Sequence, residues 1–317
     1  MSAKITTAST GGVGPQSPEI KDDTVFGFLN VNKGRGQTSR QVVTAVHRLI
    51  RPAKVGHAGT LDPLATGVLM LSIGPATRLT RFIQQQPKTY VGDFRLGQTS
   101  DSLDTETEIR ILPDAPQITR EELQTTLPEF TGEIQQAPPA YSAIKINGKR
   151  AYELARQGNQ VEIAARPIQI HSLKLLEFSY PDFQLEIVCG SGTYVRSLGR
   201  DIGASVGSTA IMTGLVRTAI GSNKIEDAID SAEIDSDLMV QEHLLPPIMA
   251  FPDHMKVEVD SATIRRIRDG CALPESTGNA APEIVAVSAN GLVVAFMSLK
   301  PGRGYTPSIN FAKHHVS

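Results

Sequence analysis

The spacing of apolar residues predicts that strands and helices alternate along most of the chain. Apolar positions recur at helical spacing over 42–50, with Thr38 or Ser39 as the cap, and Pro52 ends this helix. The same spacing or a helix-start signal predicts further helices at 76–85, 120–130, 149–156, 194–205 and 261–268. The helix over 120–130 begins with a capping box between Thr119 and Glu122.

Runs that are apolar throughout, or that alternate with polar residues, predict the strands. They lie at 24–31, 67–73, 89–96, 140–146, 167–178, 183–190, 209–220, 256–259, 283–289 and 292–299. Asn290-Gly291 between the last two strands predicts a tight hairpin turn. The elements group into a large domain over 24–250 and a small β-rich domain over 251–317. Residues 1–23, rich in Ser, Thr and Gly, predict a disordered tail; a transit peptide is the alternative.

The composition narrows the class of protein. The chain has 317 residues, of which 40% are hydrophobic and 20% charged, as is typical of soluble globular proteins. No apolar run reaches the roughly 18 residues of a membrane span, so we expect no membrane partner. The two cysteines lack zinc-ligand spacing and favour a reducing, cytoplasmic location, with Cys189 buried in the core. A disulfide between them is the less favoured alternative.

The net charge of −2 at first argues against a nucleic-acid partner, but the charges are segregated. Residues 24–92 contain nine Lys or Arg and a single carboxylate, whereas residues 225–255 contain eight Asp or Glu and no Lys or Arg. Binding follows the local electrostatic field, so the sequence predicts one cationic face suited to a polyanion.

The single carboxylate of the basic segment is Asp62, in the Gly-rich stretch 56–67. We expect the surrounding positive charge to keep Asp62 ionised by lowering its pKa. Pro63 restricts the backbone, and the glycines permit close approach of a ligand. The alternative is a turn with a helix-capping Asp. The glycine density, the adjacent His57 and the isolated charge favour a catalytic carboxylate.

Two further segments suggest ligand contacts. The segment 141–156 mixes cations with Tyr141 and Tyr152, a composition that suits RNA backbone contact and base stacking; a surface hairpin and helix without a partner is the alternative. Gly190-Ser191-Gly192-Thr193 precedes a predicted helix and resembles an anion site at a helix N-terminus. It lacks the Lys-Ser/Thr ending of a P-loop, which disfavours an ATP site.

Several of these motifs together resemble the TruB family of tRNA pseudouridine synthases. They are Gly56–Leu69 with Gly74–Leu79, Lys88-Thr89-Tyr90, Gly192-Thr193-Tyr194-Val195-Arg196 and Leu215-Val216-Arg217-Thr218. The resemblance covers about 24–220. It identifies 139–167 as an RNA-clamping insertion and 251–317 as a small PUA-like RNA-binding domain. One departure is Gly34 after Lys33, where the family usually has Pro, so we expect a looser loop there.

The resemblance implies an α+β fold with a mixed, largely antiparallel sheet flanked by helices. It also implies that the protein converts the T-loop uridine at tRNA position 55 into pseudouridine, acting as a monomer without metal or cofactor. The implied catalytic residues are Asp62 as nucleophile, Tyr90 and Arg196. The implied RNA-binding residues are His57, Lys33, Lys145, Lys149, Arg150, Arg156, Tyr194 and Leu215.

The implied roles suit the residue types. Arg196 would orient Asp62 through an ion pair, and Tyr90 would stack on the extruded uracil near C5, where a proton must leave. His57 would occupy the vacated space or bind RNA; a neutral loop histidine is the alternative. Two other functions stay open. One is a tRNA-binding and folding chaperone with a vestigial site, and the other is phosphoryl transfer at Gly190–Thr193.

Overall fold

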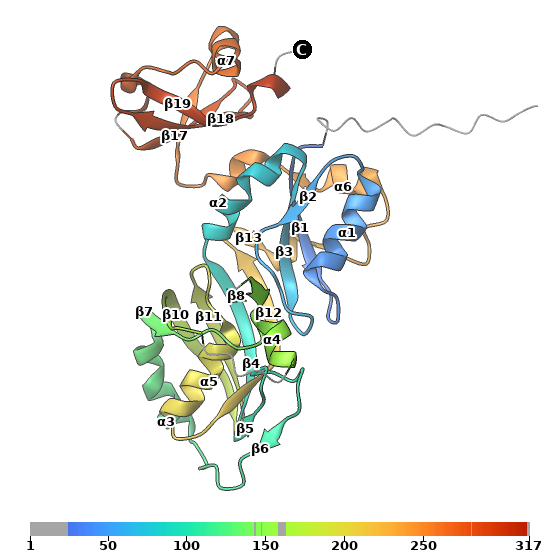
Figure 1. Cartoon of the computed structure of the whole chain (residues 1–317), viewed down its shortest axis with the longest axis vertical. Coiled ribbons are helices and arrows are strands. Elements are labelled where there is room, and N and C mark those ends of the chain that lie inside the picture. Colours follow the sequence, from blue (N-terminus) through green and yellow to red (C-terminus); the bar gives the residue numbers. More distant parts are fainter. Residues whose placement is uncertain (1–24, 143, 147, 158–162, 280, 316–317) are drawn as a thin grey trace, which may run out of the picture.

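The computed structural model describes residues 25–142, 144–146, 148–157, 163–279 and 281–315. The predicted tail at 1–23 lies outside these residues. The molecule is elongated along one axis, with a separate small sheet at one end and the long strands of the main sheet at the other (Figure 1). No helix in the described part of the chain is long and apolar enough to cross a membrane.

A large mixed sheet organises the described residues up to 250. Its described strands lie in the order β14 (Ile229–Asp230), β1 (Gly27–Lys33), β3 (Thr66–Ile73), β12 (Ala210–Ile220), β4 (Lys88–Leu96), β11 (Asp182–Cys189), β10 (Arg166–Ser179), β7 (Gly132–Gln136). Short strands β2 (Val55–His57), β13 (Asn223–Lys224) and β15 (Leu244–Leu245) pair with β3, β12 and β1. Only the β1–β14 and β12–β3 pairs among them are parallel. The expected α+β fold with a largely antiparallel sheet is confirmed.

The helices agree with most of the apolar pattern. They are α1 (Ser39–Leu49), α2 (Thr80–Gln85), α3 (Arg120–Thr126), α4 (Ala151–Arg156), α5 (Val195–Ser205), α6 (Asp237–Glu242) and α7 (Ser261–Arg268), with 3-10 turns η1 (Gly74–Leu79), η2 (Leu127–Phe130), η3 (Ile225–Asp227), η4 (Pro247–Ala250), η5 (Glu275–Gly278) and η6 (Ala312–His314). The Thr38 cap of α1 and the Thr119–Glu122 box of α3 are confirmed.

Four predicted elements differ from the structure. The helix at 120–130 ends at Thr126 and continues as a 3-10 turn, and the first two residues of the helix at 149–156 form a short strand. The helix at 76–85 is a 3-10 turn followed by α2, because Thr77 and Thr80 donate their hydroxyls to carbonyls three residues earlier and tighten the turn. The strand at 140–146 is reduced to β8 (Lys145–Ile146), which pairs with β9 (Lys149–Arg150). Pro138 and Pro139 just before it donate no backbone hydrogen bond.

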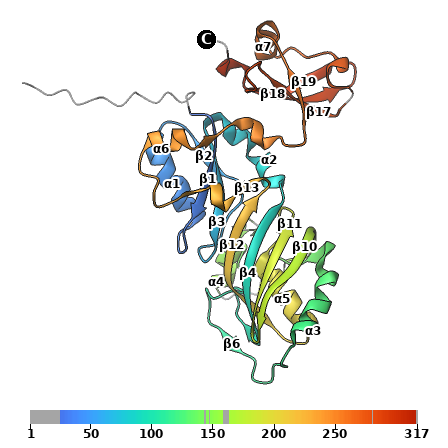
Figure 2. The same cartoon turned by 180° about the vertical axis from the view of Figure 1, so that it is seen from behind.

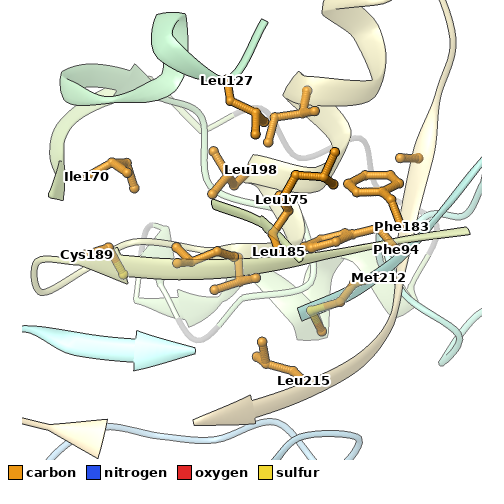
Figure 3. Close-up of a cluster of buried hydrophobic side chains, with 14 of the residues drawn as sticks. Phe94, Leu127, Ile170, Leu175, Phe183, Leu185, Cys189, Leu198, Met212 and Leu215 are labelled. Atoms are coloured by element: carbon orange, nitrogen blue, oxygen red, sulfur yellow. The ribbon is translucent and has the colours of Figure 1, made fainter. Parts of the chain in front are cut away.

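Helices α3 and α5 lie together on one face of the strands β4, β11 and β10, and the opposite face is seen without helices in front of it (Figures 1 and 2). The apolar cluster between these helices and the sheet is shown in Figure 3. Phe94 and Phe183 stack in it with ring centroids 5.1 Å apart. Cys189 is a buried, free thiol of this cluster, as predicted. Leu61, Val195 and Leu215 of this cluster also line the candidate site, so the cluster packs directly beneath it.

A second sheet follows residue 254, with the order β16 (Met255–Glu258), β17 (Glu283–Val287), β18 (Val293–Lys300) and β19 (Gly304–Asn310). The predicted turn at Asn290-Gly291 is confirmed, with φ of 73° at Gly291. Strand β19 was not predicted, because Pro307 and the polar residues around it obscure the apolar alternation. Side chains of this sheet pack against α2, as Phe296 does against Phe82.

Candidate active site

A pocket of about 700 Å³ lies where the Asp62 loop, strands β4 and β12 and the N-terminus of α5 meet. Asp62, Tyr90 and Arg196, which are far apart in sequence, all line it. The other lining residues include Thr38, Ala58, Gly59, Thr60, Leu61, Pro63, Lys88, Glu106, Tyr141, Ser142, Arg166, Gly190, Ser191, Gly192, Thr193, Tyr194, Leu215 and Arg217. The structure therefore brings the three predicted catalytic residues into one cavity.

The loop that carries Asp62 is fixed from the start of α1. The buried Ser39 hydroxyl accepts a hydrogen bond from the Leu61 amide (2.9 Å) and donates to the Leu61 carbonyl (3.1 Å). The Gly36 amide donates to the Pro63 carbonyl at 2.7 Å. Since both neighbours of Asp62 are held through their backbones, the carboxylate projects from a defined position.

The other end of this loop is held by Arg217 of β12, a fully buried side chain. Its Nε donates to the Val68 carbonyl (2.6 Å) and a terminal nitrogen donates to the Gly59 carbonyl (3.1 Å). Gly67 has φ of +97°, and a Cβ built there would lie 2.2 Å from the Arg217 carbonyl oxygen. Only glycine fits this crossing of the two backbones. Arg217 was quoted in the sequence motif but not assigned to the site, because an arginine in an apolar strand gives no sign of its partners.

Arg196 is the centre of the polar network. Its guanidinium pairs with the Asp62 carboxylate at 2.9 Å and lies 3.5 Å from that of Asp104. It also donates to the carbonyls of Ser102 (2.8 Å) and Tyr141 (3.1 Å). Only 6% of the residue is exposed. A buried arginine with four acceptors has little freedom to rotate, so it holds Asp62 in one orientation.

Asp104 is the member of this network that sequence reasoning missed. It lies in the loop between β4 and α3, after β5 (Gln98–Thr99) and before β6 (Arg110–Ile111), and only 2% of it is exposed. Its carboxylate accepts hydrogen bonds from the Ser102 hydroxyl (2.5 Å) and the Glu106 amide (2.9 Å). The sequence shows only a polar, acidic loop there, and nothing in the pattern marks one of its acids as buried.

The structure corrects the expected ionisation of Asp62. Its side chain keeps 38% of its surface accessible, yet removal from bulk water within the pocket raises its pKa above the usual range, and Asp104 and Glu106 raise it further. Arg196 lowers this pKa but does not outweigh the loss of hydration. The expectation of a lowered pKa was wrong because it counted charges along the sequence and could not include the loss of hydration in the pocket, or the acids Asp104 and Glu106 that the fold brings near.

Tyr90 lies on β4 beside Arg217, whose guanidinium carbon is 6.0 Å from the centre of the tyrosine ring. Burial raises the pKa of the Tyr90 phenol, so the hydroxyl is neutral at physiological pH. A neutral aromatic ring at the pocket wall offers a stacking surface for a planar ligand. Leu215 of β12 pairs with Gly92, two residues after Tyr90 on β4. It also lines the pocket and contributes an apolar wall.

The turn before α5 is clamped by two residues that the sequence analysis did not select. Gln136 of β7 is buried; its amide oxygen accepts from the Tyr194 N–H (2.8 Å), and its amide nitrogen donates to the Tyr194 carbonyl (3.1 Å). Arg166 of β10 donates to the Gly192 carbonyl (2.8 Å), and its guanidinium lies 5.5 Å from the centre of the Tyr194 ring. Tyr194, predicted to bind RNA, thus sits at the pocket wall in a fixed position.

Lys33 was predicted to bind RNA, but the structure shows it fully buried. Its ammonium donates to the carbonyls of Gly34 (3.0 Å) and Gln37 (2.8 Å), and burial lowers its pKa to about 8. Lys33 therefore stabilises the loop before α1 from inside and is not available to a phosphate. The same bonds tie down the loop that the missing proline was expected to loosen.

The structure describes the remaining predicted RNA-binding residues only in part. His57 lies on β2 and is not among the residues that line the pocket; burial lowers its pKa, which favours the neutral imidazole. The backbones of Lys145, Lys149, Arg150 and Arg156 lie in the β8–β9 hairpin and α4. Helix α4 lies on the same face of the sheet as α5 in both views (Figures 1 and 2). Their side chains lie outside the described part.

The arrangement suits covalent or electrostatic catalysis by a carboxylate. An oriented Asp62, a neutral aromatic wall and a buried cation meet in a cavity large enough for a nucleotide, since ligand pockets typically measure about 300–1,000 Å³. Within the described residues, no group of three or more His, Cys, Asp or Glu side chains is arranged to hold a metal ion.

Comparison with known proteins agrees with this geometry. The model of a family described as TruB family pseudouridylate synthase (N terminal domain) matches residues 47–195. The tRNA pseudouridine synthase B of Rhodopirellula baltica is 38% identical over 276 residues, which cover 81% of this chain and 79% of that protein. The protein of the same name from Dehalococcoides mccartyi is 40% identical over 264 residues, covering 82% and 88%. That of Bacteroides fragilis is 45% identical over 211 residues, covering 65% and 91%.

Solved structures share the fold at lower identity. A chain from the crystal structure of a Cbf5-Nop10-Gar1 complex aligns with a TM-score of 0.66 at 22% identity, covering 90% of this chain and 84% of that one. A chain from the structure of an H/ACA RNP bound to a substrate RNA containing 2′-deoxyuridine aligns with a TM-score of 0.67 at 20% identity, covering 90% and 85%. At these identities the likeness concerns the fold.

Proposed function

Because this chain belongs to the TruB family of pseudouridylate synthases, we propose that it is an isomerase that converts a uridine of tRNA into pseudouridine. The target is the T-loop uridine at position 55. The observation that carries the proposal is the Asp62–Arg196 ion pair of 2.9 Å in a pocket that Tyr90 also lines.

The reaction breaks the bond between N1 of uracil and C1′ of ribose, turns the base, and joins C5 to C1′. The proton on C5 leaves and N1 gains one, so no atom or electron is gained overall. A carboxylate can act as the nucleophile in such a sequence without metal or cofactor. Asp62 takes this role, and Arg196 keeps its carboxylate aimed into the pocket.

The uridine must leave the loop of the tRNA before Asp62 can reach it. Extrusion of a base costs a few kcal/mol, which is offset by contacts in the pocket. Tyr90 supplies the stacking surface for the extruded uracil and lies near C5, and Leu215 and Tyr194 complete the wall around it. The cavity of about 700 Å³ has room for a nucleotide.

The rest of the tRNA is held by positive charge. Lys145, Lys149, Arg150 and Arg156 contact phosphates of the T arm, and His57 contacts the RNA or fills the space that the base vacates. Affinity then falls with salt, with a slope near −0.7 to −0.9 per phosphate contact. The protein acts as a monomer in the cytoplasm, with 139–167 as an RNA clamp and 251–317 as a PUA-like domain.

Asp62→Asn is the direct test. The amide keeps the size of the side chain but is not a nucleophile, so pseudouridine formation in a T-arm RNA falls by on the order of 10³-fold or more, while RNA binding and melting temperature persist. Mass spectrometry of the RNA measures the product. The control is Asp182→Asn, which removes the remote ion pair with Arg95 (2.7 Å) and leaves the rate unchanged.

Two results would contradict the proposal. Full activity of Asp62→Asn would remove Asp62 from the chemistry. A wild type that binds tRNA with salt-sensitive affinity but leaves every uridine intact would favour the alternative, a tRNA-binding and folding module. Calorimetry with ATP tests the phosphoryl-transfer alternative at Gly190–Thr193. If the protein is a pseudouridine synthase, we expect no heat of ATP binding.

A further inference from the structure

The exposed face of helix α1 carries positive charge and no negative charge. Arg40 and Arg48 are exposed on one side of the helix, with Thr44 and His47 between them, and the exposed Arg51 follows just after the helix ends. Residues 38–54 contain no Asp or Glu. We call Arg40, Arg48 and Arg51 the α1 stripe. The apolar side of the helix packs into the core, so the stripe is turned toward solvent.

The α1 stripe does not hold the fold together through ion pairs. Helix α6 packs beside α1, since its Val240 belongs to the same apolar cluster, and it carries Asp237 and Glu242. Within the described residues, however, no side chain of the stripe forms an ion pair. These arginines therefore have no carboxylate partner in this part of the chain, although an acidic helix lies beside them.

Arg40 is also poorly placed for the stability of the helix. It is the second residue of α1, and the first turn holds no acidic residue. The partial positive charge at a helix N-terminus disfavours a cation there, whereas Arg48 in the last turn is favoured. A side chain that its own helix disfavours points to a ligand outside the chain. That ligand is an anion, because the group that meets it is a cation.

The α1 stripe and the pocket lie on the same face of the main sheet. Arg217 of β12 is paired in register with both Tyr90 of β4 and Gly67 of β3, so the three residues point to one face. Leu69, two residues after Gly67, shares that face and packs against α1. The N-terminal cap of α1, Thr38, lines the pocket itself. The stripe therefore begins near the rim of the pocket and leads away from it along the helix.

We propose that the α1 stripe binds phosphates of the tRNA whose uridine occupies the pocket. This inference rests on the proposed function, and it adds a contact surface apart from the cations of 139–167. Arg40 and Arg48 are about 12 Å apart along the helix axis. One small anion cannot contact both, whereas a nucleic-acid strand presents negative charge along its whole length. The stripe thus fits the backbone of a polynucleotide that continues past the rim of the pocket.

Arg40→Gln and Arg48→Gln test the stripe one residue at a time. Each should weaken tRNA binding about five- to eightfold at about 0.1 M salt and reduce the salt slope by roughly one unit. The double variant should weaken binding by roughly 25- to 60-fold. At saturating tRNA, kcat should stay unchanged, because the stripe does not touch the reacting base. Fluorescence anisotropy over a range of salt concentrations and initial rates of pseudouridine formation measure these quantities.

Melting temperatures of the free protein separate binding from a structural role. Loss of Arg40 removes a cation from the helix N-terminus, so the melting temperature should rise by about 1–3 °C. Loss of Arg48 removes a favourable cation from the last turn, so the melting temperature should fall by a similar amount. Opposite shifts in stability, with the same loss of affinity, cannot come from damage to α1.

The matched control is Lys174→Gln, which removes the same charge elsewhere. Lys174 is an exposed residue of β10 and lies opposite Glu186 in the sheet. Its neighbour Leu175 belongs to the cluster beneath α3 and α5, so Lys174 points to the opposite face. Affinity and salt slope should not change. A control that weakens binding as much as the stripe variants would reduce the effect to net charge and overturn the inference.

The outcomes also separate the inference from the function on which it rests. An active wild type whose two stripe variants keep full tRNA affinity overturns the inference alone. A wild type that forms no pseudouridine overturns the function, while weaker tRNA binding by the variants still supports the stripe as an RNA surface. Sedimentation tests another occupant, the acidic segment 225–255 of a second copy. A dimeric wild type and a monomeric Arg40→Gln with full tRNA affinity would make the stripe a subunit interface and overturn the inference.

Discussion

At the scale of single residues, Arg196 interacts with two carboxylates, and the proposed chemistry depends on both. Asp62 faces the pocket at 2.9 Å from the guanidinium, and the buried Asp104 lies behind it at 3.5 Å. Asp104 has two opposing effects. It helps to hold the arginine in place, and its charge also raises the pKa of Asp62.

Asp104→Asn tests both effects. In the proposed mechanism the nucleophile is the ionised Asp62, so the rate should fall as pH drops through its pKa, and a raised pKa places that fall at higher pH. Without the Asp104 charge the pKa of Asp62 is lower, so the acid limb of the pH–rate profile should move to lower pH. The plateau rate should fall roughly tenfold, because Arg196 loses one of its acceptors.

The control for this variant lies in the same loop. Asp101 pairs with the exposed Arg110 at 2.6 Å, so Asp101→Asn should leave both the plateau and the acid limb unchanged. Rates of pseudouridine formation from pH 4.5 to pH 8 measure the profile. An acid limb that moves to higher pH in Asp104→Asn would contradict the electrostatic account.

Sequence reasoning found some of these residues and missed others for a physical reason. Asp62, Tyr90 and Arg196 belong to recognisable local motifs, and the structure brings them together. Asp104 and Gln136 act through partners 92 and 58 residues away along the chain, and neither has a local signature. Lys33 was misplaced because a lysine in a loop normally faces solvent.

At the scale of elements, the site depends on how strands hold the entrance to α5. Strand β7 pairs with β10 through Gln136 and Arg166, which are directly opposite one another. From these positions Gln136 bonds both backbone groups of Tyr194 and Arg166 bonds the Gly192 carbonyl. The edge strand β7 and its neighbour β10 thus fix the turn before α5, the helix that carries Arg196.

Gln136→Leu tests this positioning. The substitution leaves the Tyr194 amide without its partner, while the Tyr194 carbonyl keeps the hydrogen bond from the Leu198 amide (3.1 Å), and we expect it to lower the free energy of unfolding by about 1–3 kcal/mol. The shift of Arg196 should lower kcat by roughly 10- to 100-fold with a smaller change in RNA affinity. Gln136→Glu retains the acceptor for the Tyr194 amide and should recover part of kcat.

Gln184→Leu is the matched control. Gln184 donates to the Asp93 carboxylate at 2.8 Å away from the pocket, so its loss should leave kcat unchanged. Urea denaturation and single-turnover kinetics measure the two properties. A kcat of Gln136→Leu equal to that of the control would show that the clamp serves stability alone.

Most elements were predictable because each long strand and helix has a clear apolar period. The exceptions have particular causes. Hydroxyls tightened 74–79 into a 3-10 turn, and prolines shortened the strand at 140–146. The order of the strands in the sheet could not be predicted from the sequence. Strand β4 lies between β12 and β11, and each of these partners is about a hundred residues away in the chain. A period of two identifies a strand but not its neighbour.

At the scale of the whole molecule, one apolar cluster joins the two sheets. It contains Phe82 of α2, Phe251 and Phe296 of β18, with the Phe82 ring 4.7 Å from each of the other two. Arg81 adds a cation 4.8 Å from the Phe82 ring centre, and Arg78 donates to the Asn310 carbonyl at 3.0 Å. The two sheets therefore share a core and are not merely tethered.

Phe82→Ala tests this coupling. Loss of a buried phenylalanine should cost about 3–5 kcal/mol, and because the lost contacts join the two sheets, calorimetry should show two separate unfolding transitions in place of one. The control is Phe183→Ala, which empties the core of the main sheet alone, where Phe183 stacks on Phe94. It should lower the melting temperature without a split. Identical unfolding curves for the two variants would contradict a shared core.

The same cluster includes Ala58 and Val68, which flank the Asp62 loop, and Val285 and Val293 of the second sheet. The packing that begins beside the Asp62 loop therefore continues into the second sheet, and Phe82 and Phe296 form a contact that joins the two. This limits how the protein can be recombined: a chimaera that takes its last sixty residues from another source must also reproduce the aromatic surface that Phe296 presents to Phe82. An exchange that ignores it would expose Phe82 to water and weaken the cluster on the side of the main sheet.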